Sequence, residues 1–345
     1  MLQTIHGEAD ASLVSAALPH EHFFSDLRPL VAPLDNGIFY DKVQLNNYGA
    51  LSRNPYAVLD NAVLDSENSV EDELNRIKKA GFNLAADVTT ADFGRTAENI
   101  LKLKELSEKT GVNIILGCGS YIEDAVSDAV KALSVEQMEK IIIKELTVGI
   151  EDTGIKAGVI GEIGSGFKVS ENEAKFLTAA AHAQNITGFG MHIHACLWNR
   201  TGLDALDIAV RAGANPEKIC IDHVDVMLDE EYILSIMEKG AYAEFDDFGK
   251  EYYVDRKNRN VLLHSFAYDA QRVQIIKKLI EKGFKNQILI SNDVCLKSML
   301  HSFGGWGYDH IGENIVPMME DFGISNEDII AIIRDNPIRF LERGN

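Results

Sequence analysis

The sequence contains little cysteine and no CxxC pair. Its four thiols are spread over a chain of 345 residues, so the close spacing used by thiolate metal sites and dithiol redox motifs is absent. Three of them lie within or just beyond apolar runs, which is typical of reduced, buried thiols. We therefore expect a cytoplasmic protein with free cysteines.

Long apolar segments are also missing. No apolar run approaches the roughly 20 residues of a membrane span, and no basic segment followed by an apolar one marks a signal peptide. Positive charge is scarce, because 33 Lys and Arg stand against 53 Asp and Glu, for a formal net charge of -20. Such an acidic surface repels phosphate groups, so we expect neither nucleic acid nor an anionic membrane as a partner, but a small-molecule substrate.

No Pro/Gly/Ser-rich linker and no low-complexity segment divides the chain, which predicts one domain over residues 1–345. Short apolar runs of strand length alternate with longer amphipathic segments of helical period. The predicted strands are 12–20, 82–89, 112–120, 157–164, 188–195, 217–224, 241–247 and 287–293. The predicted helices include 69–81, 170–188, 228–240 and 268–283. Ser69 opens the first, and Ser170 with Glu173 gives the second the spacing of a capping box.

Eight strands alternating with helices predict an α/β fold, the (β/α)8 TIM barrel. A doubly wound open sheet is the alternative. We prefer the barrel because the strand count reaches eight and no GxGxxG turn follows the first strand. Two segments exceed a plain barrel, namely a long insertion after strand one, over residues 23–68, and extra helix at the C-terminus, over 325–345.

Side chains of metal-ligand type recur at the ends of five predicted strands, where barrel enzymes carry their chemistry. His20 and His22 stand at i and i+2 of strand one, so both face the barrel interior while Glu21 turns away. Any one such histidine is more often a hydrogen-bonded structural residue. The recurrence of imidazoles and carboxylates at one relative place nevertheless predicts a metal centre. Its members are His20, His22, Glu162, His194, His223 and Asp293.

In this order of ligands, and in the motifs LPHEH, AGVIGEIG, IDHVD, ILISND, GGWGYDHI and NPIRFL, the sequence resembles the phosphotriesterase family of the amidohydrolase superfamily. The resemblance covers nearly the whole chain. It implies two divalent metal ions, zinc foremost and manganese or cobalt as alternatives, and a homodimer. It places His20, His22 and Asp293 on one ion and His194 and His223 on the other.

The bridging position falls on Glu162, which resembles the phosphotriesterase-related branch in which a glutamate replaces a carboxylated lysine. Lys156 and Lys168 lie outside the predicted strand end, so neither is expected to bridge. Two positions depart from the organophosphate-degrading relatives. Asp247 stands where they place a histidine that shuttles protons, and Val226 stands where they often have an acid. These departures argue against phosphotriesters as the native substrates.

Two cations about 3.5–4 Å apart can hold a bridging hydroxide, which would attack a small carboxylic ester, lactone or N-acyl amide. Asp293 would take the proton and Asp247 would relay it. Tyr121, Tyr308 and Trp306 are the predicted substrate contacts. The roles of Asp225, Asp246 and His192 stay open between proton relay and orientation of the ligands.

Two alternatives remain at this point. The same metals could hydrolyse a phosphate or phosphonate ester, or the barrel could bind a metal or ligand without turnover. Arg256, Lys257 and Arg259 could meet an anionic substrate, although such charges are more often solvated. Loops of this kind set specificity, and their sequence does not name the substrate.

Overall fold

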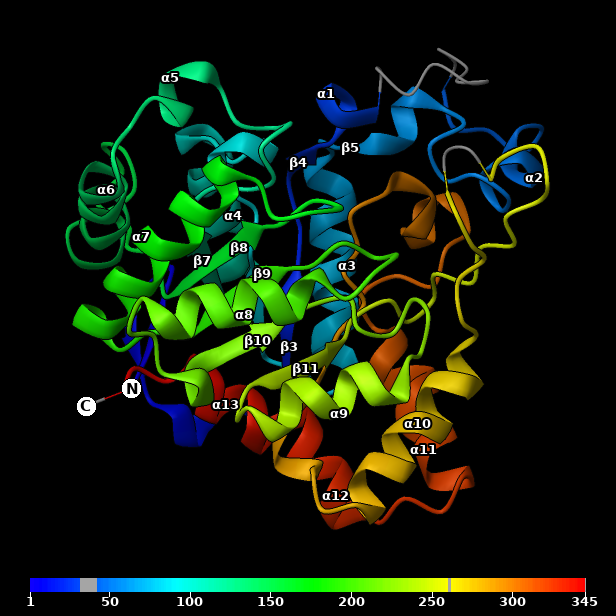
Figure 1. Ribbon diagram of the computed structural model, residues 1–345. Coiled ribbons are helices and arrows are strands. Elements are labelled where there is room, and N and C mark those ends of the chain that lie inside the picture. The colour runs from blue at the N-terminus through cyan, green and yellow to red at the C-terminus, as the bar shows by residue number, and fades with distance from the viewer. Residues whose placement is uncertain (32–41, 260–261, 345) are drawn as a thin grey trace.

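The computed structural model describes residues 1–31, 42–259 and 262–344, and its centre is a barrel of eight parallel strands (Figure 1). The strands follow one another around the barrel in chain order. They are β3 (Ala17–Glu21), β6 (Leu84–Asp87), β7 (Asn113–Cys118), β8 (Val159–Gly164), β9 (Met191–His194), β10 (Ile219–Ile221), β11 (Tyr242–Phe245) and β12 (Ile288–Ile290). The predicted fold class is confirmed. Strand one begins later than predicted, because Ala11–Leu13 forms a 3₁₀ turn instead.

Helices cover the outside of the barrel. The larger ones are α3 (Glu67–Lys79), α4 (Ala97–Thr110), α6 (Val135–Thr147), α7 (Glu171–Thr187), α8 (Thr201–Arg211), α9 (Glu230–Glu238) and α10 (Asp269–Glu281). The four predicted helices are all present. The capping box of α7 forms as expected, with Ser170 bonded to the Glu173 amide. The predicted start of α3 at Ser69 was wrong. The N-cap residue is Ser66, whose side chain accepts the backbone amide of Ser69.

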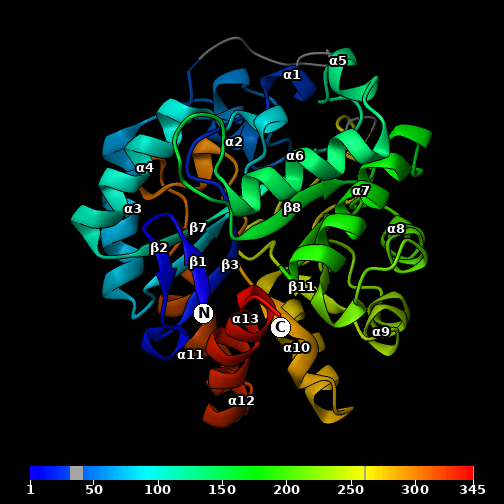
Figure 2. The same ribbon diagram turned by 90° about the vertical axis from the view of Figure 1, so that its left-hand side faces the viewer.

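The amino end of the barrel is closed by both ends of the chain. A hairpin of β1 (Leu2–Thr4) and β2 (Gly7–Ala9) and the last helix, α13 (Asn336–Leu341), lie there side by side (Figures 1 and 2). Leu2 and Phe340 belong to one buried cluster with inward side chains of the strands. The α-amino group of Met1 pairs with Glu342. Apolar packing therefore fills the amino end of the barrel.

The insertion after strand one lies at the opposite end, near the carboxyl ends of the strands (Figures 1 and 2). It contains β4 (Ser25–Asp26), α1 (Arg28–Val31), α2 (Tyr48–Leu51) and β5 (Val63–Leu64), and β4 pairs antiparallel with β5. Residues 32–41 of the predicted insertion lie outside the described part. The insertion thus supplies the wall above the strand ends.

The predicted C-terminal helical extension is present as α12 (Asn326–Ile330), a π-turn and α13, after α11 (Val316–Asp321); Asn345 lies outside the described residues. A short α5 (Asp128–Lys131) precedes α6. Among the helices that the structure describes, none combines the length and the apolar character needed to cross a membrane.

Candidate metal centre

The six predicted metal-ligand residues meet at the carboxyl ends of the strands. His22 Nε2 lies 3.1 Å from Asp293 Oδ1, and His20 Nε2 lies 3.7 Å from the same oxygen. Zinc bonds to nitrogen and oxygen are about 2.0–2.2 Å long, so ligands of one ion lie roughly 3–4 Å from each other. These three side chains therefore have the spacing expected around a shared cation.

Glu162 lies between the two groups of histidines. Its Oε1 is 2.7 Å from His194 Nδ1 and 3.0 Å from His223 Nε2, and its Oε2 is 3.8 Å from His22 Nε2. Burial by itself would raise the pKa of Glu162, but the neighbouring His194, His223 and His20 outweigh burial and hold that pKa well below its usual value. An ionised carboxylate with one oxygen toward each group fits the bridging position.

Several atoms of this centre are buried without a hydrogen-bond partner among the described residues. Both ring nitrogens of His20 and the Oε2 atom of Glu162 are in this state, although the two residues are at most 1% exposed. Buried polar atoms in folded proteins nearly always have a partner. The unpaired Nε2 of His20 lies 3.8 Å from Glu162 and 3.7 Å from Asp293, and imidazole and carboxylate atoms grouped in this way fit a divalent cation.

Three of the candidate ligands lie beyond their strands rather than on them, and one of them, His22, directly follows β3, which ends at Glu21. β10 ends at Ile221 and β12 ends at Ile290, so the sequence-based placement of His223 and Asp293 on strands was wrong. Both have positive φ, 58° for His223 and 44° for Asp293. Residues other than glycine adopt this left-handed conformation rarely, and functional sites are where such strain collects. The turns redirect these two side chains toward the other ligands.

The histidine ligands are oriented by hydrogen bonds on their second nitrogens. The Thr89 hydroxyl lies 2.9 Å from His22 Nδ1, and Asp246 Oδ1 lies 2.9 Å from His223 Nδ1. Such partners fix the ring orientation and raise the basicity of the ligand atom. Burial raises the pKa of Asp246 to about 7.

Asp225 lies two residues after His223 but has other partners. Arg272 Nε donates to Asp225 Oδ2 at 2.8 Å, and the Asp247 backbone amide donates to the same oxygen at 3.2 Å. Asp225 therefore holds the backbone after β11, and Asp246 is the residue that orients His223.

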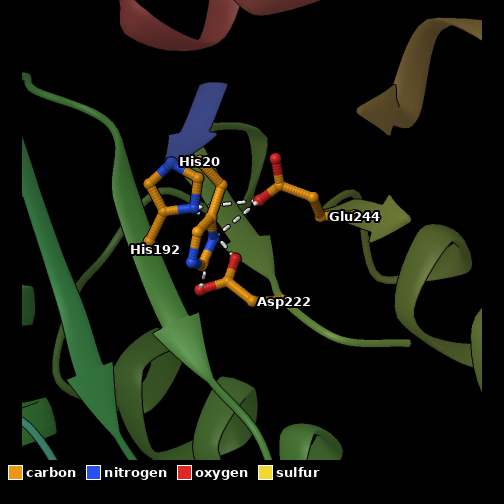
Figure 3. A group of neighbouring side chains, drawn as sticks. All are labelled: His20, His192, Asp222 and Glu244. Atoms are coloured by element: carbon orange, nitrogen blue, oxygen red, sulfur yellow. Dashed lines mark hydrogen bonds and ion pairs between the residues drawn. The ribbon is translucent and has the colours of Figure 1, made fainter. Parts of the chain in front are cut away.

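A layer of buried charge lies behind His20, on the side away from the cavity. Figure 3 shows the rings of His20 and His192 facing the carboxylates of Asp222 and Glu244. His192 Nδ1 is 2.9 Å from Asp222 Oδ1 and 3.1 Å from Glu244 Oε2, and His20 Nδ1 is 3.4 Å from the latter oxygen. Burial lowers the pKa of His192, but the two carboxylates outweigh it and raise the pKa to about 9. His192 thus offsets buried negative charge and supports His20 through Glu244.

Lys250 is a buried residue beside the candidate ligands that sequence reasoning missed. It is 5% exposed, its Nζ lies 2.9 Å from Asp247 Oδ1, and it pairs with Asp293 Oδ2. Burial by itself would raise the pKa of Asp293, but Lys250 first, then His22 and His20, hold it below its usual value. No motif marked this lysine, because its place depends on the turn that follows β11.

A cavity of about 220 Å³ opens onto these residues. Tyr121 lines it, and the Tyr121 hydroxyl is 3.2 Å from His194 Nδ1. Trp306 is 53% exposed and lines a neighbouring cavity instead. Tyr308 is buried and its hydroxyl donates to the His22 carbonyl oxygen at 2.5 Å, so it contacts the backbone of a ligand rather than the cavity.

None of the predicted loop cations lines this cavity. Arg256, Lys257 and Arg259 are exposed, as is Lys168, and Lys156 lines a hollow beside Met1. Within the described residues, Lys250 is the one lysine or arginine that lines the cavity. Lys250 is therefore the lysine or arginine of the described residues whose charge a substrate in this cavity would meet.

Comparison with known sequences gives whole-length matches. A protein-family model described as the phosphotriesterase family matches residues 1–341. N-acetyltaurine hydrolase from Danio rerio is 34% identical over 345 residues, which is 99% of this chain and 97% of that protein. N-acetyltaurine hydrolase from Homo sapiens is 32% identical with the same coverage. The matched region includes every candidate ligand.

Solved structures also match this chain over nearly its whole length. A resiniferatoxin-binding protein from Rhodobacter sphaeroides superposes with a TM-score of 0.92 at 25% identity, over 99% of this chain and 94% of that chain. A phosphotriesterase homology protein from Escherichia coli, solved with phosphate in its active site, superposes with a TM-score of 0.78 at 26% identity. This superposition covers 95% of this chain and 99% of the Escherichia coli chain.

Proposed function

This chain belongs to the phosphotriesterase family and is a hydrolase, and on that premise we propose that it uses two divalent cations to cleave a small N-acyl amide. The observation that carries the proposal is the convergence of six ligand-type side chains around buried, unpaired nitrogen and oxygen atoms. Zinc suits this mixture of imidazole and carboxylate, and manganese and cobalt are the alternatives. The relatives named as N-acetyltaurine hydrolases favour an amide over an ester or lactone.

The cavity supports a small substrate with an apolar acyl group. Its volume of about 220 Å³ is below the usual range for drug-sized ligands, roughly 300–1,000 Å³. Most of its wall is apolar or aromatic, contributed by Leu27, Leu30, Val31, Tyr56, Phe93, Ile122, Leu197, Phe266 and Leu296. The polar groups are gathered on the side of the candidate metal centre, so a substrate would place its scissile bond there.

Bound at this site, the two cations would polarise the substrate carbonyl and lower the pKa of a water molecule to about 7. The residues of the chain supply the rest of the chemistry. Asp293 accepts the proton of the attacking water, and Lys250 holds Asp293 Oδ2 beside Asp247. Tyr121 lies where its hydroxyl can donate to the carbonyl oxygen of the substrate.

A substrate panel with metal analysis tests the proposal. We expect about two equivalents of metal per chain and hydrolysis of N-acetyltaurine to acetate and taurine. N-acetyl-β-alanine, which differs in the acid of its leaving group, and an uncharged N-acetyl amine serve as matched substrates. Absence of bound metal after supplementation, or metal without hydrolysis of any acyl amide, would contradict it.

A second candidate function is hydrolysis of a phosphate or phosphonate ester at the same centre. It is favoured by the solved relative that holds phosphate in its active site. Including a phosphonate ester and a γ-lactone in the panel separates the two, since the preferred substrate has the highest kcat/KM. The cytoplasmic location proposed from the sequence is supported by four free cysteines.

A further inference from the structure

Glu21 turns its carboxylate away from the cavity and accepts four hydrogen bonds from the residues that follow β12. Its Oε1 accepts from the Ser291 hydroxyl at 2.9 Å, the Asn292 backbone amide at 2.9 Å and the Asn292 side-chain amide at 2.8 Å. Its Oε2 accepts from the Val294 backbone amide at 2.9 Å. Because Glu21 is 0% exposed, water cannot replace any of these bonds.

These bonds lie where the barrel closes. β3 and β12 stand at the two ends of the strand order, and no ladder of backbone hydrogen bonds joins them within the described residues. The His20 amide donates to the Ser291 hydroxyl across the same boundary, at 3.3 Å. The side chain of Glu21 therefore does at this seam what backbone pairing does between the other neighbouring strands.

The four bonds surround Asp293. The two backbone amides that bind Glu21 belong to Asn292 and Val294, the residues on either side of Asp293. Asp293 has a φ of 44°, a conformation that persists when its surroundings enforce it. In that conformation Asp293 Oδ1 reaches 3.1 Å from His22 Nε2.

We propose that Glu21 is a positioning residue that sets Asp293 in place as a metal ligand. Strand β3 and the residue after it would then supply two ligands with inward side chains, His20 and His22, and fix a third through Glu21, whose side chain points outward between them. This inference rests on the proposed metal centre. It adds that the centre is assembled by the closure of the barrel between its first and last strands.

Two substitutions of Glu21 and one control test this role. Glu21→Gln keeps one acceptor oxygen but turns an amide donor toward a backbone donor, and Glu21→Leu removes both acceptors. Glu173 is the matched control, because it is 3% exposed and accepts backbone amides of Glu123, Gly166 and Ser170. Glu173 does not line the cavity, so Glu173→Gln disturbs a similar buried cluster elsewhere.

The chelator-stripped proteins are titrated with cobalt, and their hydrogen exchange is followed over residues 288–296. We expect Glu21→Gln to weaken cobalt binding by roughly 10–100-fold and to lower kcat with little change in KM. Exchange in the 288–296 segment should rise in the metal-free variant, and Glu21→Leu should show larger effects. Glu173→Gln should bind cobalt as the wild type does, although its stability also falls.

Wild-type cobalt affinity and wild-type exchange in Glu21→Gln would overturn the positioning role. If Glu21→Leu fails to fold, Glu21→Gln and the exchange measurement still decide. A wild-type chain that takes up no cobalt, zinc or manganese would refute the proposed metal centre. In that case the exchange data would separately decide whether Glu21 fixes the segment around Asp293.

Discussion

Asp293 is held by two kinds of contact at the scale of single residues. Its side chain meets His22 on one oxygen and Lys250 on the other. Its backbone lies between the two amides that bind Glu21. A carboxylate held in this way loses little rotational freedom when it binds a cation, which favours a precise geometry.

Asp293→Asn tests the base in the proposed chemistry. An amide accepts a proton poorly, so kcat should fall by roughly 10²–10⁴-fold, the usual contribution of general acid–base catalysis. With metal supplied in excess, metal content should stay largely intact, because five other ligand-type residues remain. Asp309→Asn is the control, since Asp309 is buried but does not line the cavity. Full turnover by Asp293→Asn would refute its role as base.

Lys250→Met tests the cation between the two aspartates. Its loss removes the cation that pairs with the buried Asp247 and Asp293, which should lower the free energy of unfolding of the metal-free protein by roughly 3–5 kcal/mol. Lys250→Met/Asp247→Asn should recover part of the loss in urea titrations, and Lys168→Met, at an exposed lysine, should cost almost nothing. Equal stability of Lys250→Met and the wild type would show that the ion pairs of Lys250 with Asp247 and Asp293 are not needed for stability.

At the scale of elements, the strands end early and turns complete the site. β10 and β12 have three residues each, and their ligands follow in left-handed turns. Helices such as α6 and α7 begin with full capping boxes and hold the strands that precede them. The capping box of α7 lies at the same end of its β–α unit as the candidate site, because Glu173 also accepts the backbone amide of Gly166, which follows β8.

Ser170→Ala tests the capping box of α7. Loss of the hydroxyl that accepts the Glu173 amide should lower the free energy of unfolding by about 1 kcal/mol, as measured by urea denaturation. kcat should not change, because the cap lies outside the cavity. Ser302→Ala, at an exposed serine, is the control and should have no effect. A large fall in kcat would mean that α7 reaches the site.

At the scale of the whole molecule, closure of one barrel brings together candidate ligands that are 273 positions apart. His20 and Asp293 become neighbours only when β3 meets β12. The insertion after β3 adds Leu27, Leu30 and Val31 to the cavity wall. Closure of the barrel therefore builds both the proposed metal centre and the cavity beside it.

Removal of metal tests whether activity depends on metal and whether Glu162 is the bridging residue. A chelator should abolish activity, and zinc, manganese or cobalt alone should restore it, because a glutamate needs no carbon dioxide to bridge two cations. Parallel samples with and without bicarbonate provide the control. A bicarbonate requirement would point to a carboxylated lysine and contradict the role of Glu162.

The proposed homodimer is tested by light scattering after size-exclusion chromatography. We expect twice the mass of one chain at micromolar concentration. The mass of a single chain under those conditions would contradict the expectation taken from the family resemblance.

Hydrophobic periodicity was enough to predict the strands, and with them the barrel. Because side chains on a strand alternate, the same reading brought His20 and His22 to one face and turned Glu21 away. These features depend on local chain geometry, which a sequence carries directly. The family resemblance then assigned Glu162 to the bridging position.

Only the tertiary structure decided the contacts that are made by turns and those between the first and last strands of the barrel. Lys250 and Asp246 gain their partners from the path of the chain after β11, and Glu21 gains four donors when the last strand arrives beside the first. The hydrogen bond from the Tyr308 hydroxyl to the His22 carbonyl oxygen is another such contact. Contacts between residues far apart in the chain depend on where whole elements pack, and no local pattern of residues encodes that placement.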